Sequence, residues 1–329
     1  MKLLTTSEYI ADASKAIARS KKRVIVMTLC ISKERETAQF IDSLIVASKN
    51  GVDVSVAADT FTFSEFGGYF NPFKRWAKYS REAKKLSKTL KKNGVSFRWL
   101  GGNHLINPFA GVTHVKWTVV DDTLYCFGGV NLYGRGARNT DYMFKVKDSK
   151  LADLLASEHQ KIVQTDRAPA NYSGFYKQLG YGTLLIDSGE KNESMIYERA
   201  VELAKQSKSI LFVSQYCPTG KLAKILRSKK AVIYYNQPKN THRWTKLMLR
   251  FSRLTTGLKS KYKKPTYLHA KFIVFTMESG SKVALTGSHN FSYTGVRFGT
   301  REVELETKDK HVISQLEEFF KTDIESLTK

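Results

Sequence analysis

The chain has 329 residues, 42% of them hydrophobic, and its 54 lysines and arginines outnumber 30 aspartates and glutamates, giving a formal net charge of +24. This length suits two ordinary domains or one large duplicated unit, and the charge indicates an anionic partner, either nucleic acid or an acidic membrane surface. Three scattered cysteines argue against a disulfide framework and favour a reducing compartment. The longest apolar run, residues 24–31, is too short to span a bilayer, and the N-terminus lacks a signal-peptide core, so we expect a cytoplasmic protein.

The first half of the chain is predicted to alternate helices with strands. Apolar residues at helical spacing predict helices around residues 9–17 and 40–47. Apolar runs predict a strand from Val24 and another over residues 52–56.

The second half repeats this order. Helices are predicted around residues 196–203 and 222–226, and strands at 210–213 and 231–235. The alternation predicts an α/β fold of two similar repeats, each a mixed, largely parallel sheet flanked by helices.

The boundary between the repeats is predicted where proline and glycine recur, at Pro169, Gly174, Gly180 and Gly182. We therefore assign residues 1–165 to the first repeat, 166–190 to a connecting segment and 191–329 to the second repeat.

Each repeat also contains a predicted β-hairpin with the same polar residues at its open end. These residues are His114, Lys116 and Asn131 in the first hairpin, and His269, Lys271 and Asn290 in the second. Residues two apart in a strand point to one face, and the returning strand brings the asparagine back beside the His-x-Lys pair. A carboxylate follows each hairpin, Asp141 ten residues after Asn131 and Glu302 twelve residues after Asn290. One His-x-Lys pair would indicate little, but two complete copies predict an active site.

At these residues the chain resembles the phospholipase D superfamily, whose signature is His-x-Lys, four residues, Asp, then Gly-Gly or Gly-Ser and Asn. The first copy, with Asp121 and Gly128-Gly129, matches in full, and the sequence around it is most similar to the cardiolipin synthase branch. The second copy has Thr276 where the family has Asp. In the family this Asp looks structural, so Asp121 is expected to give structural support, and Thr276 affects local support more than chemistry.

The resemblance implies two pseudo-symmetric halves packed around one active site. One histidine would attack phosphorus and form a phosphohistidine, while the other protonates the leaving alcohol; a second alcohol or water then attacks. We expect His114 to be the nucleophile, because its motif is the more complete, although the sequence does not settle this.

The residue types agree with that chemistry. An anionic phosphodiester needs positive charge around its non-bridging oxygens, which Lys116 and Lys271 would supply, with the Asn131 and Asn290 amides as further donors. The carboxylates of Asp141 and Glu302 would fix the tautomer and direction of the rings, as in catalytic triads. Two more residues are expected nearby: Ser288 as a further donor to the substrate, and His289 as support from behind. Neither a metal nor a cofactor is expected, because no metal-ligand spacing occurs.

The positive charge gathers in two segments, residues 71–92 with net charge +8 and residues 239–264 with +9. Each segment also carries apolar residues at helical spacing, which are Phe73, Trp76, Ala83, Leu86 and Leu90 in the first and Trp244, Leu247, Met248, Phe251 and Leu254 in the second. A basic helix with an apolar face is typical of a membrane interface, although such a face more often packs on its own domain. We expect Trp76, Trp244 and Phe251 to contact a membrane.

Three functions remain open on the sequence alone. The favoured one is phosphatidyl transfer to an alcohol, or phospholipase D hydrolysis, by an enzyme held on the inner face of the cell membrane. The alternative is a metal-independent nuclease, which would use the basic segments as a phosphate track and some of the 16 tyrosines for stacking. The third is a lipid- or nucleic-acid-binding protein that has lost activity. A monomer would be sufficient for activity, because both motifs lie in one chain.

Overall fold

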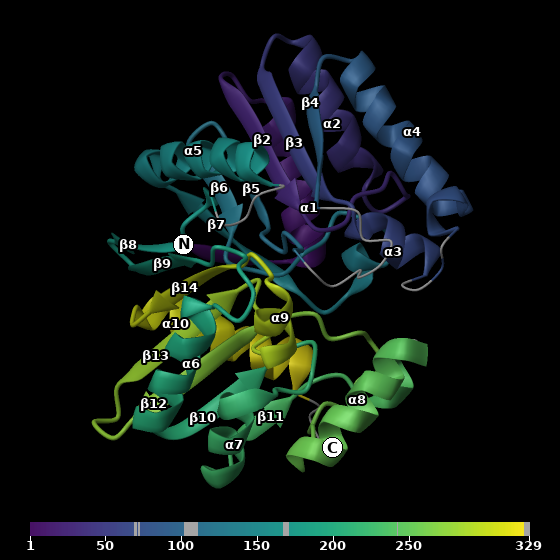
Figure 1. The fold of residues 1–329 in the computed structure, drawn as a ribbon. Helices are drawn as coiled ribbons and strands as arrows, with labels where there is room; N and C mark the ends of the chain where they lie inside the picture. Colours follow the sequence, from purple (N-terminus) through teal and green to yellow (C-terminus); the bar gives the residue numbers. More distant parts are fainter. Residues whose placement is uncertain (69–70, 72, 102–110, 167–170, 242, 326–329) are drawn as a thin grey trace.

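The computed structural model describes residues 1–68, 71, 73–101, 111–166, 171–241 and 243–325, and the side chains of Gly67, Arg243 and Trp244 lie outside that description. The described chain forms two halves, each with a seven-stranded mixed sheet covered by helices (Figure 1). The predicted α/β fold of two similar halves is therefore confirmed.

The first half has the strand order β1-β7-β6-β5-β2-β3-β4. Its strands are β1 (Lys2–Thr5), β2 (Arg23–Thr28), β3 (Asp53–Asp59), β4 (Ser96–Leu100), β5 (Trp117–Val120), β6 (Thr123–Cys126) and β7 (Tyr142–Lys147). Its helices are α1 (Thr6–Ala18), α2 (Ala38–Lys49), α3 (Phe61–Gly67), α4 (Lys78–Lys92) and α5 (Ser149–Thr165), with short 3-10 turns η1 (Lys74–Trp76) and η2 (Gly136–Arg138).

The second half has the strand order β11-β10-β12-β13-β14-β9-β8. Its strands are β8 (Phe175–Leu179), β9 (Gly182–Ile186), β10 (Ser207–Val213), β11 (Val232–Tyr234), β12 (Phe272–Met277), β13 (Lys282–Gly287) and β14 (Val303–Thr307). Its helices are α6 (Met195–Gln206), α7 (Gly220–Ser228), α8 (Arg243–Thr256), α9 (Tyr293–Phe298) and α10 (Lys310–Phe319), with the short turns η4 (Pro238–Asn240) and η5 (Phe320–Ile324).

The two sheets repeat one topology. The order β1-β7-β6-β5-β2-β3 corresponds to β9-β14-β13-β12-β10-β11, and the additional strands β4 and β8 lie at opposite edges of this common unit. The counterpart of β1 is thus β9, which lies inside residues 166–190. The segment expected to connect the repeats therefore contains β8 and β9, the last two strands at one edge of the second sheet, and Gly180 and Tyr181 form their hairpin turn.

The expectation of largely parallel sheets is wrong. Among the described strands, three of twelve pairs are parallel, namely β2–β3, β3–β4 and β10–β11. Parallel neighbours require a crossover connection, which α2, α4 and α7 provide, whereas the short turns of β5–β6 and β12–β13 enforce antiparallel pairing. The hairpins that carry the His-x-Lys motifs thus make most of each sheet antiparallel.

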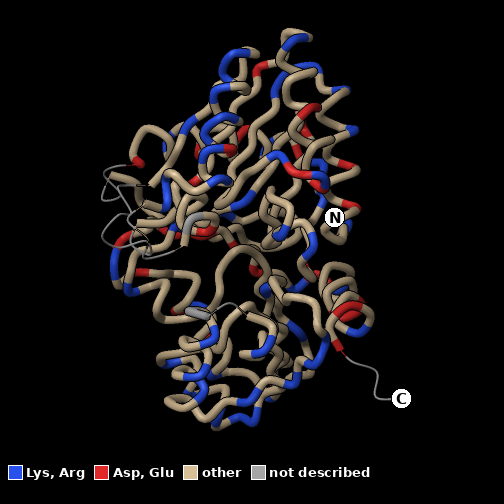
Figure 2. The backbone as a smooth tube through the Cα atoms, turned by 90° about the vertical axis from the view of Figure 1, so that its right-hand side faces the viewer, with Lys and Arg blue, Asp and Glu red and all other residues tan. Residues whose placement is uncertain are grey.

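The halves share one hydrophobic core. Residues of the first half, among them Trp117 and Tyr142, pack in the same cluster as Phe272 and Leu305 of the second half. Each half also has one large hydrophobic cluster of its own. The Tyr142 hydroxyl crosses the interface to Thr286 at 2.5 Å. The halves therefore form one body, with lysines and arginines distributed over both (Figure 2).

Candidate active site

The segment that leads into β5 places His114 at the junction of the two halves. Its backbone N–H donates to the carbonyl of Arg301 at 2.9 Å, and a short parallel bridge joins Thr113 to Arg301. This pairing sets the ring beside the next residue of the second half, so that Nδ1 lies 2.8 Å from Oε2 of Glu302. The ring also makes a hydrogen bond with the backbone of Ser288.

The second histidine is held by equivalent contacts, with the roles of the two halves exchanged. The backbone N–H of His269 donates to the carbonyl of Thr140 at 2.9 Å, and Thr140 bridges to Leu268. Its Nδ1 lies 2.6 Å from Oδ2 of Asp141. Each ring is thus oriented by a carboxylate of the other half. The sequence predicted one carboxylate for each ring, but not this exchange.

Both motif lysines are buried. The Nζ atom of Lys116 donates to the carbonyl of His114 at 2.6 Å, and that of Lys271 donates to the carbonyl of His269 at 2.5 Å. Burial, together with the positive charge of Lys271, lowers the pKa of Lys116 to about 7. Burial lowers the pKa of Lys271 to about 8, against the opposing effect of the carboxylates. The structure therefore places two buried cations beside the histidines.

The two carboxylates differ in their electrostatics. Burial acts to raise the pKa of Asp141, but the neighbouring His269 and Lys271 outweigh it, so that the pKa is lowered. Burial raises the pKa of Glu302, and the opposing effects of His289 and Lys116 do not cancel it. Asp141 is consequently the more firmly ionised member of the pair.

The rings themselves are poor bases in the free protein. Burial and the charges of Lys116 and Lys271 hold the pKa of His114 well below its usual value. Burial and the charge of Lys271 lower the pKa of His269 to about 3, although Asp141 acts in the opposite direction. Both imidazoles are therefore neutral near pH 7, which is the form that can act as a nucleophile.

The asparagines of the two motifs follow the returning strands β6 and β13. Asn131 is buried, Asn290 is partly buried, and among the described residues the Oδ1 atom of each has no hydrogen-bond partner. A buried polar atom without a partner is costly unless a ligand or water satisfies it. The amides are thus available to a bound substrate.

The Gly-Gly of the first motif is required by close packing. A Cβ atom on Gly129 would lie 2.8 Å from Oδ2 of Asp141 and 2.9 Å from Nζ of Lys271, and one on Gly128 would lie 1.9 Å from the carbonyl oxygen of Tyr142. The loop therefore passes directly beside the carboxylate that orients His269.

The corresponding position in the second half is Ser288, which was expected to donate to the substrate. Its buried hydroxyl instead donates to Oε2 of Glu302 at 2.5 Å and accepts from the backbone N–H of Val303 at 2.9 Å. The structure thus corrects the expectation: the Ser288 hydroxyl contacts the carboxylate that orients His114, and the Ser288 backbone makes a hydrogen bond with the His114 ring.

His289 and Glu304 form a buried polar layer behind the site. The backbone N–H of Phe291 donates to Nδ1 of His289 at 2.8 Å, so the ring proton resides on Nε2. Glu304 accepts from the backbone N–H of His289 at 3.3 Å, and burial raises the pKa of its carboxyl well above the usual value. His289 lies where the sequence placed it, whereas Glu304 was missed. The Glu-x-Glu spacing from Glu302, which puts both side chains on one face of a strand, was the available signal.

Asp121 lies at the far end of the first hairpin, away from the histidines. Its carboxylate accepts hydrogen bonds from the backbone N–H groups of Lys21, Lys22 and Arg23 at 2.8–3.1 Å, and these bonds lower its pKa even though burial opposes them. Thr276, the counterpart in the second half, instead lies in β12, where it pairs with Ser209 of β10 and with Lys282 of β13. The longer ladder provides locally what the carboxylate provides in the first half.

The residues expected at a membrane lie on the surface. Trp76 in η1 is 65% exposed and Phe251 in α8 is 67% exposed. Trp244 also belongs to α8, but its side chain lies outside the described residues. In the part of the chain that the structure describes, no helix is long and apolar enough to cross a bilayer. Over the same residues, no group of three or more His, Cys, Asp and Glu side chains could hold a metal ion.

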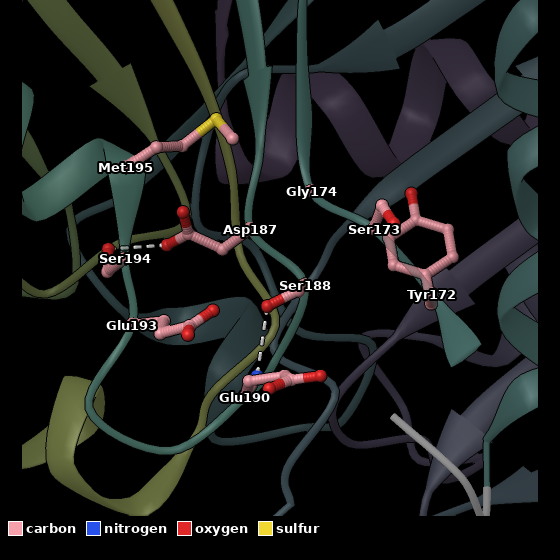
Figure 3. A pocket seen from close by; sticks show the side chains of 9 residues that line it. All are labelled: Tyr172, Ser173, Gly174, Asp187, Ser188, Glu190, Glu193, Ser194 and Met195. Carbon is pink, nitrogen blue, oxygen red and sulfur yellow. Dashed lines mark hydrogen bonds between the residues drawn. The ribbon is translucent and has the colours of Figure 1, made fainter. Parts of the chain in front are cut away.

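A cavity of about 350 Å³ lies between β9 and the start of α6 (Figure 3). None of the predicted site residues lines it. Its buried carboxyl, Asp187, accepts from the Ser194 hydroxyl at 2.6 Å and from the backbone N–H of Ile196, and burial raises the pKa of Asp187 to about 7. The carboxyl thus caps the first turn of α6.

Comparison with known proteins places the chain in a wider context. The sequence profile of the family described as "Cardiolipin synthase, PLD-like domain" matches residues 14–163 and 202–324. No curated protein matches the sequence.

Two solved structures share the fold. Phosphatidylserine synthase from Haemophilus influenzae Rd KW20 is similar with a TM-score of 0.71 and 15% sequence identity, over 99% of this chain and 87% of that one. Polyphosphate kinase from Porphyromonas gingivalis is similar with a TM-score of 0.60 and 11% identity, over 96% of this chain and 46% of that one. At these identities the likeness concerns the fold alone.

Proposed function

The chain belongs to the cardiolipin synthase, phospholipase D-like domain family, and from this premise we propose that it transfers a phosphatidyl group from a phospholipid to an alcohol. The observation that carries the proposal is the pair of buried histidines, each with Nδ1 held by a carboxylate of the opposite half. Transfer through a covalent intermediate needs one group that attacks phosphorus and another that handles the proton of the alcohol.

We assign the attack to His114. When the anionic phosphodiester binds, Nε2 of His269 takes up a proton from solvent. Nε2 of His114 then forms a bond to phosphorus while the bond from phosphorus to the leaving alcohol oxygen breaks, and that oxygen takes the proton from Nε2 of His269. The acceptor alcohol then gives its proton to His269 and attacks phosphorus, and the bond from phosphorus to His114 breaks. Water in place of the alcohol would give hydrolysis.

The unequal carboxylates support this division of roles. A general acid must hold a proton, and the ionised Asp141 stabilises an imidazolium at His269 more than Glu302 does at His114. The nucleophile must stay neutral, and the pKa of His114 is far below its usual value. A bound phosphodiester adds negative charge, which raises the pKa of the lysines and of the proton-carrying ring.

The remaining residues stabilise the charge on phosphorus. Lys116 and Lys271 would contact the non-bridging oxygens, where negative charge grows as the nucleophile attacks. The Nδ2–H groups of Asn131 and Asn290 would donate to the same oxygens, and their unsatisfied Oδ1 atoms would accept from a substrate hydroxyl.

The test is an assay with phosphatidylglycerol vesicles in EDTA, with lipid products resolved by mass, and parallel assays with single- and double-stranded DNA and RNA. We expect cardiolipin and glycerol from the wild type and neither from His114→Ala or His269→Ala. His311→Ala, which changes an exposed histidine, is the matched control and should remain active.

Other outcomes separate the alternatives. Phosphatidic acid would retain the lipid substrate and change the acceptor to water. Cleaved nucleic acid with unchanged lipid would contradict the proposal and make the protein a nuclease. Binding of lipid without turnover would indicate a binding protein. Trapping of the phosphatidyl group on His114, but not on His269, in the presence of substrate would support the assigned nucleophile.

A further inference from the structure

The exposed apolar side chains of this protein are concentrated in the two basic segments. Eleven large hydrophobic residues are exposed in the described part of the chain, and seven of them lie within residues 71–92 and 239–264. We call these seven the apolar surface set: Phe73, Trp76, Tyr79, Leu247, Met248, Phe251 and Leu254. Single exposed apolar residues are ordinary, but clustering of this kind marks an interaction surface.

Helix α8 turns its apolar stripe away from the protein. Thr245 and Leu249 are buried, whereas Leu247, Phe251 and Leu254 are 57%, 67% and 83% exposed. Residues advance by about 100° along a helix, so these three lie within about 60° of one another, opposite the buried face. The helix therefore packs on the domain by one narrow face and presents its larger apolar face outward.

The first segment contributes differently. The stripe expected along α4 is in fact core, because Ala83, Leu86 and Leu90 are buried. The exposed residues come from η1 and the first turn of α4, where the rings of Phe73 and Trp76 lie 5.8 Å apart. These two aromatic side chains are 67% and 65% exposed.

Basic residues surround both apolar groups. The exposed lysines and arginines include Lys78, Arg81, Lys85 and Lys88 in the first segment, and Arg250, Lys259, Lys261 and Lys263 in the second. Glu82 is the single acid within the two segments. The apolar surface set is therefore flanked by positive charge.

Both groups lie on one side of the molecule, at α4 in the first half and α8 in the second (Figure 1), the side that Figure 2 shows face on. The first group also connects to the candidate site. Tyr79 contacts Phe66 at a ring distance of 6.1 Å, and Phe66 contacts Tyr133 at 5.5 Å, two residues after Asn131. A chain of ring contacts therefore joins the first group to the segment that follows Asn131.

We propose that the apolar surface set and its basic flanks dock the protein onto an anionic lipid bilayer. Aromatic and aliphatic side chains enter the interface between headgroups and acyl chains, and lysines and arginines contact anionic headgroups. A nucleic acid would use the charge but would leave Leu247 and Leu254 exposed, since aliphatic side chains cannot stack on bases as aromatic rings do. A second copy of the chain would bring two strongly positive faces together.

This inference rests on the proposed phospholipid activity, because an enzyme that acts on phospholipids must reach a bilayer. Vesicle binding can nevertheless be measured separately from turnover. The test compares sedimentation of the wild type with vesicles of phosphatidylcholine and phosphatidylglycerol at 3:1 and with vesicles of phosphatidylcholine alone. We expect strong binding to the first that weakens with salt, and weak binding to the second.

The decisive variant is the triple substitution Leu247→Gln, Phe251→Gln and Leu254→Gln, which leaves the charge unchanged. We expect its affinity for the anionic vesicles to fall by about tenfold or more. The matched control, Val46→Gln with Tyr176→Gln, replaces two exposed apolar residues elsewhere and should bind as the wild type does. Because all five side chains are exposed, we expect unchanged thermal unfolding midpoints.

The outcomes separate this proposal from the catalytic one. The triple variant should retain activity on a short-chain phosphatidylglycerol that dissolves as monomers, because its substitutions lie outside the candidate site. Wild-type affinity of the triple variant for anionic vesicles would overturn the docking proposal. The docking proposal would also be overturned if the triple variant lost nucleic-acid binding, or lost a dimer that the wild type forms, while its vesicle binding stayed unchanged. Vesicle binding with no activity on any lipid would contradict the proposed activity alone.

Discussion

Ser288 donates a hydrogen bond to the same Glu302 oxygen that lies 2.8 Å from Nδ1 of His114. The first half has no counterpart, because Gly129 occupies the equivalent position beside Asp141. The two histidines are thus oriented by carboxylates with different surroundings, and substitutions at these two positions should have different effects.

Ser288→Ala should lower kcat by about tenfold, equivalent to the loss of one charge-assisted hydrogen bond. The Ser288 hydroxyl acts to lower the pKa of Glu302, so its removal raises that pKa. Ionised Glu302 is needed to orient the ring, and the acid limb of the kcat/KM profile should therefore move to higher pH. Ser279→Ala, an exposed serine, is the control. A lower kcat with an unmoved acid limb would show a packing role only.

Gly129→Ala should abolish most activity. The added Cβ would lie within 3.0 Å of both Asp141 and Lys271, and displacement of either by a fraction of an ångström disturbs the direction of His269. We expect a loss of about 10²-fold or more in kcat/KM. Gly180→Ala is the matched control, because a Cβ there meets nothing within 4 Å. Activity near that of the wild type would contradict the packing described for the Gly-Gly loop.

The pH dependence of activity should reveal the buried lysines. The pKa of Lys116 is about 7 and that of Lys271 about 8, and each lysine carries its charge only below its pKa. Transition-state stabilisation is therefore fully present below about pH 7, and kcat/KM should fall as the pH rises from 7 to 8. Arginine keeps its charge, so the alkaline limb of Lys116→Arg should move to higher pH. An unmoved limb in that variant would assign the titration to another group.

Asp121→Ala should reduce stability rather than chemistry. It removes the acceptor of three backbone N–H groups at the start of β2, which we expect to cost about 1–3 kcal/mol of unfolding free energy and to lower the thermal midpoint by several degrees. Asp122→Ala is the neighbouring control.

Thr276→Asp should not increase activity, because Thr276 lies in a strand ladder and aspartate is unfavourable there. Increased activity in that variant would contradict the structural role given to this position.

The sequence was sufficient for the order of elements and for the polar residues of the candidate site. Periodicity located α1, β2, α2 and β3 and their counterparts, because each buries one continuous apolar face. The repeated His-x-Lys pattern and the carboxylate after each hairpin identified residues that the structure brings into contact. Local patterns suffice for such features.

Other features depend on tertiary contacts that no local pattern encodes. The exchange of Asp141 and Glu302 between halves follows from two backbone bridges across the interface. Burial of Leu86 and exposure of Phe251 depend on which face of each helix meets its domain, although both belong to similar basic, apolar-striped segments. The alternation of helices and strands predicts parallel neighbours, but the hairpins and the strands that pair with them are antiparallel and make up most of each sheet.

The exchange of carboxylates has a consequence for how such a chain can diverge. Had the protein been an assembly of two identical copies, one substitution would alter both histidine environments together. Covalent fusion of the halves removes that restriction, so Val130 and Met143 can remain core residues while their counterparts, His289 and Glu304, become a buried polar layer. One ring can thus specialise as nucleophile and the other as proton carrier, while neither half can be lost, because each supplies what orients its partner.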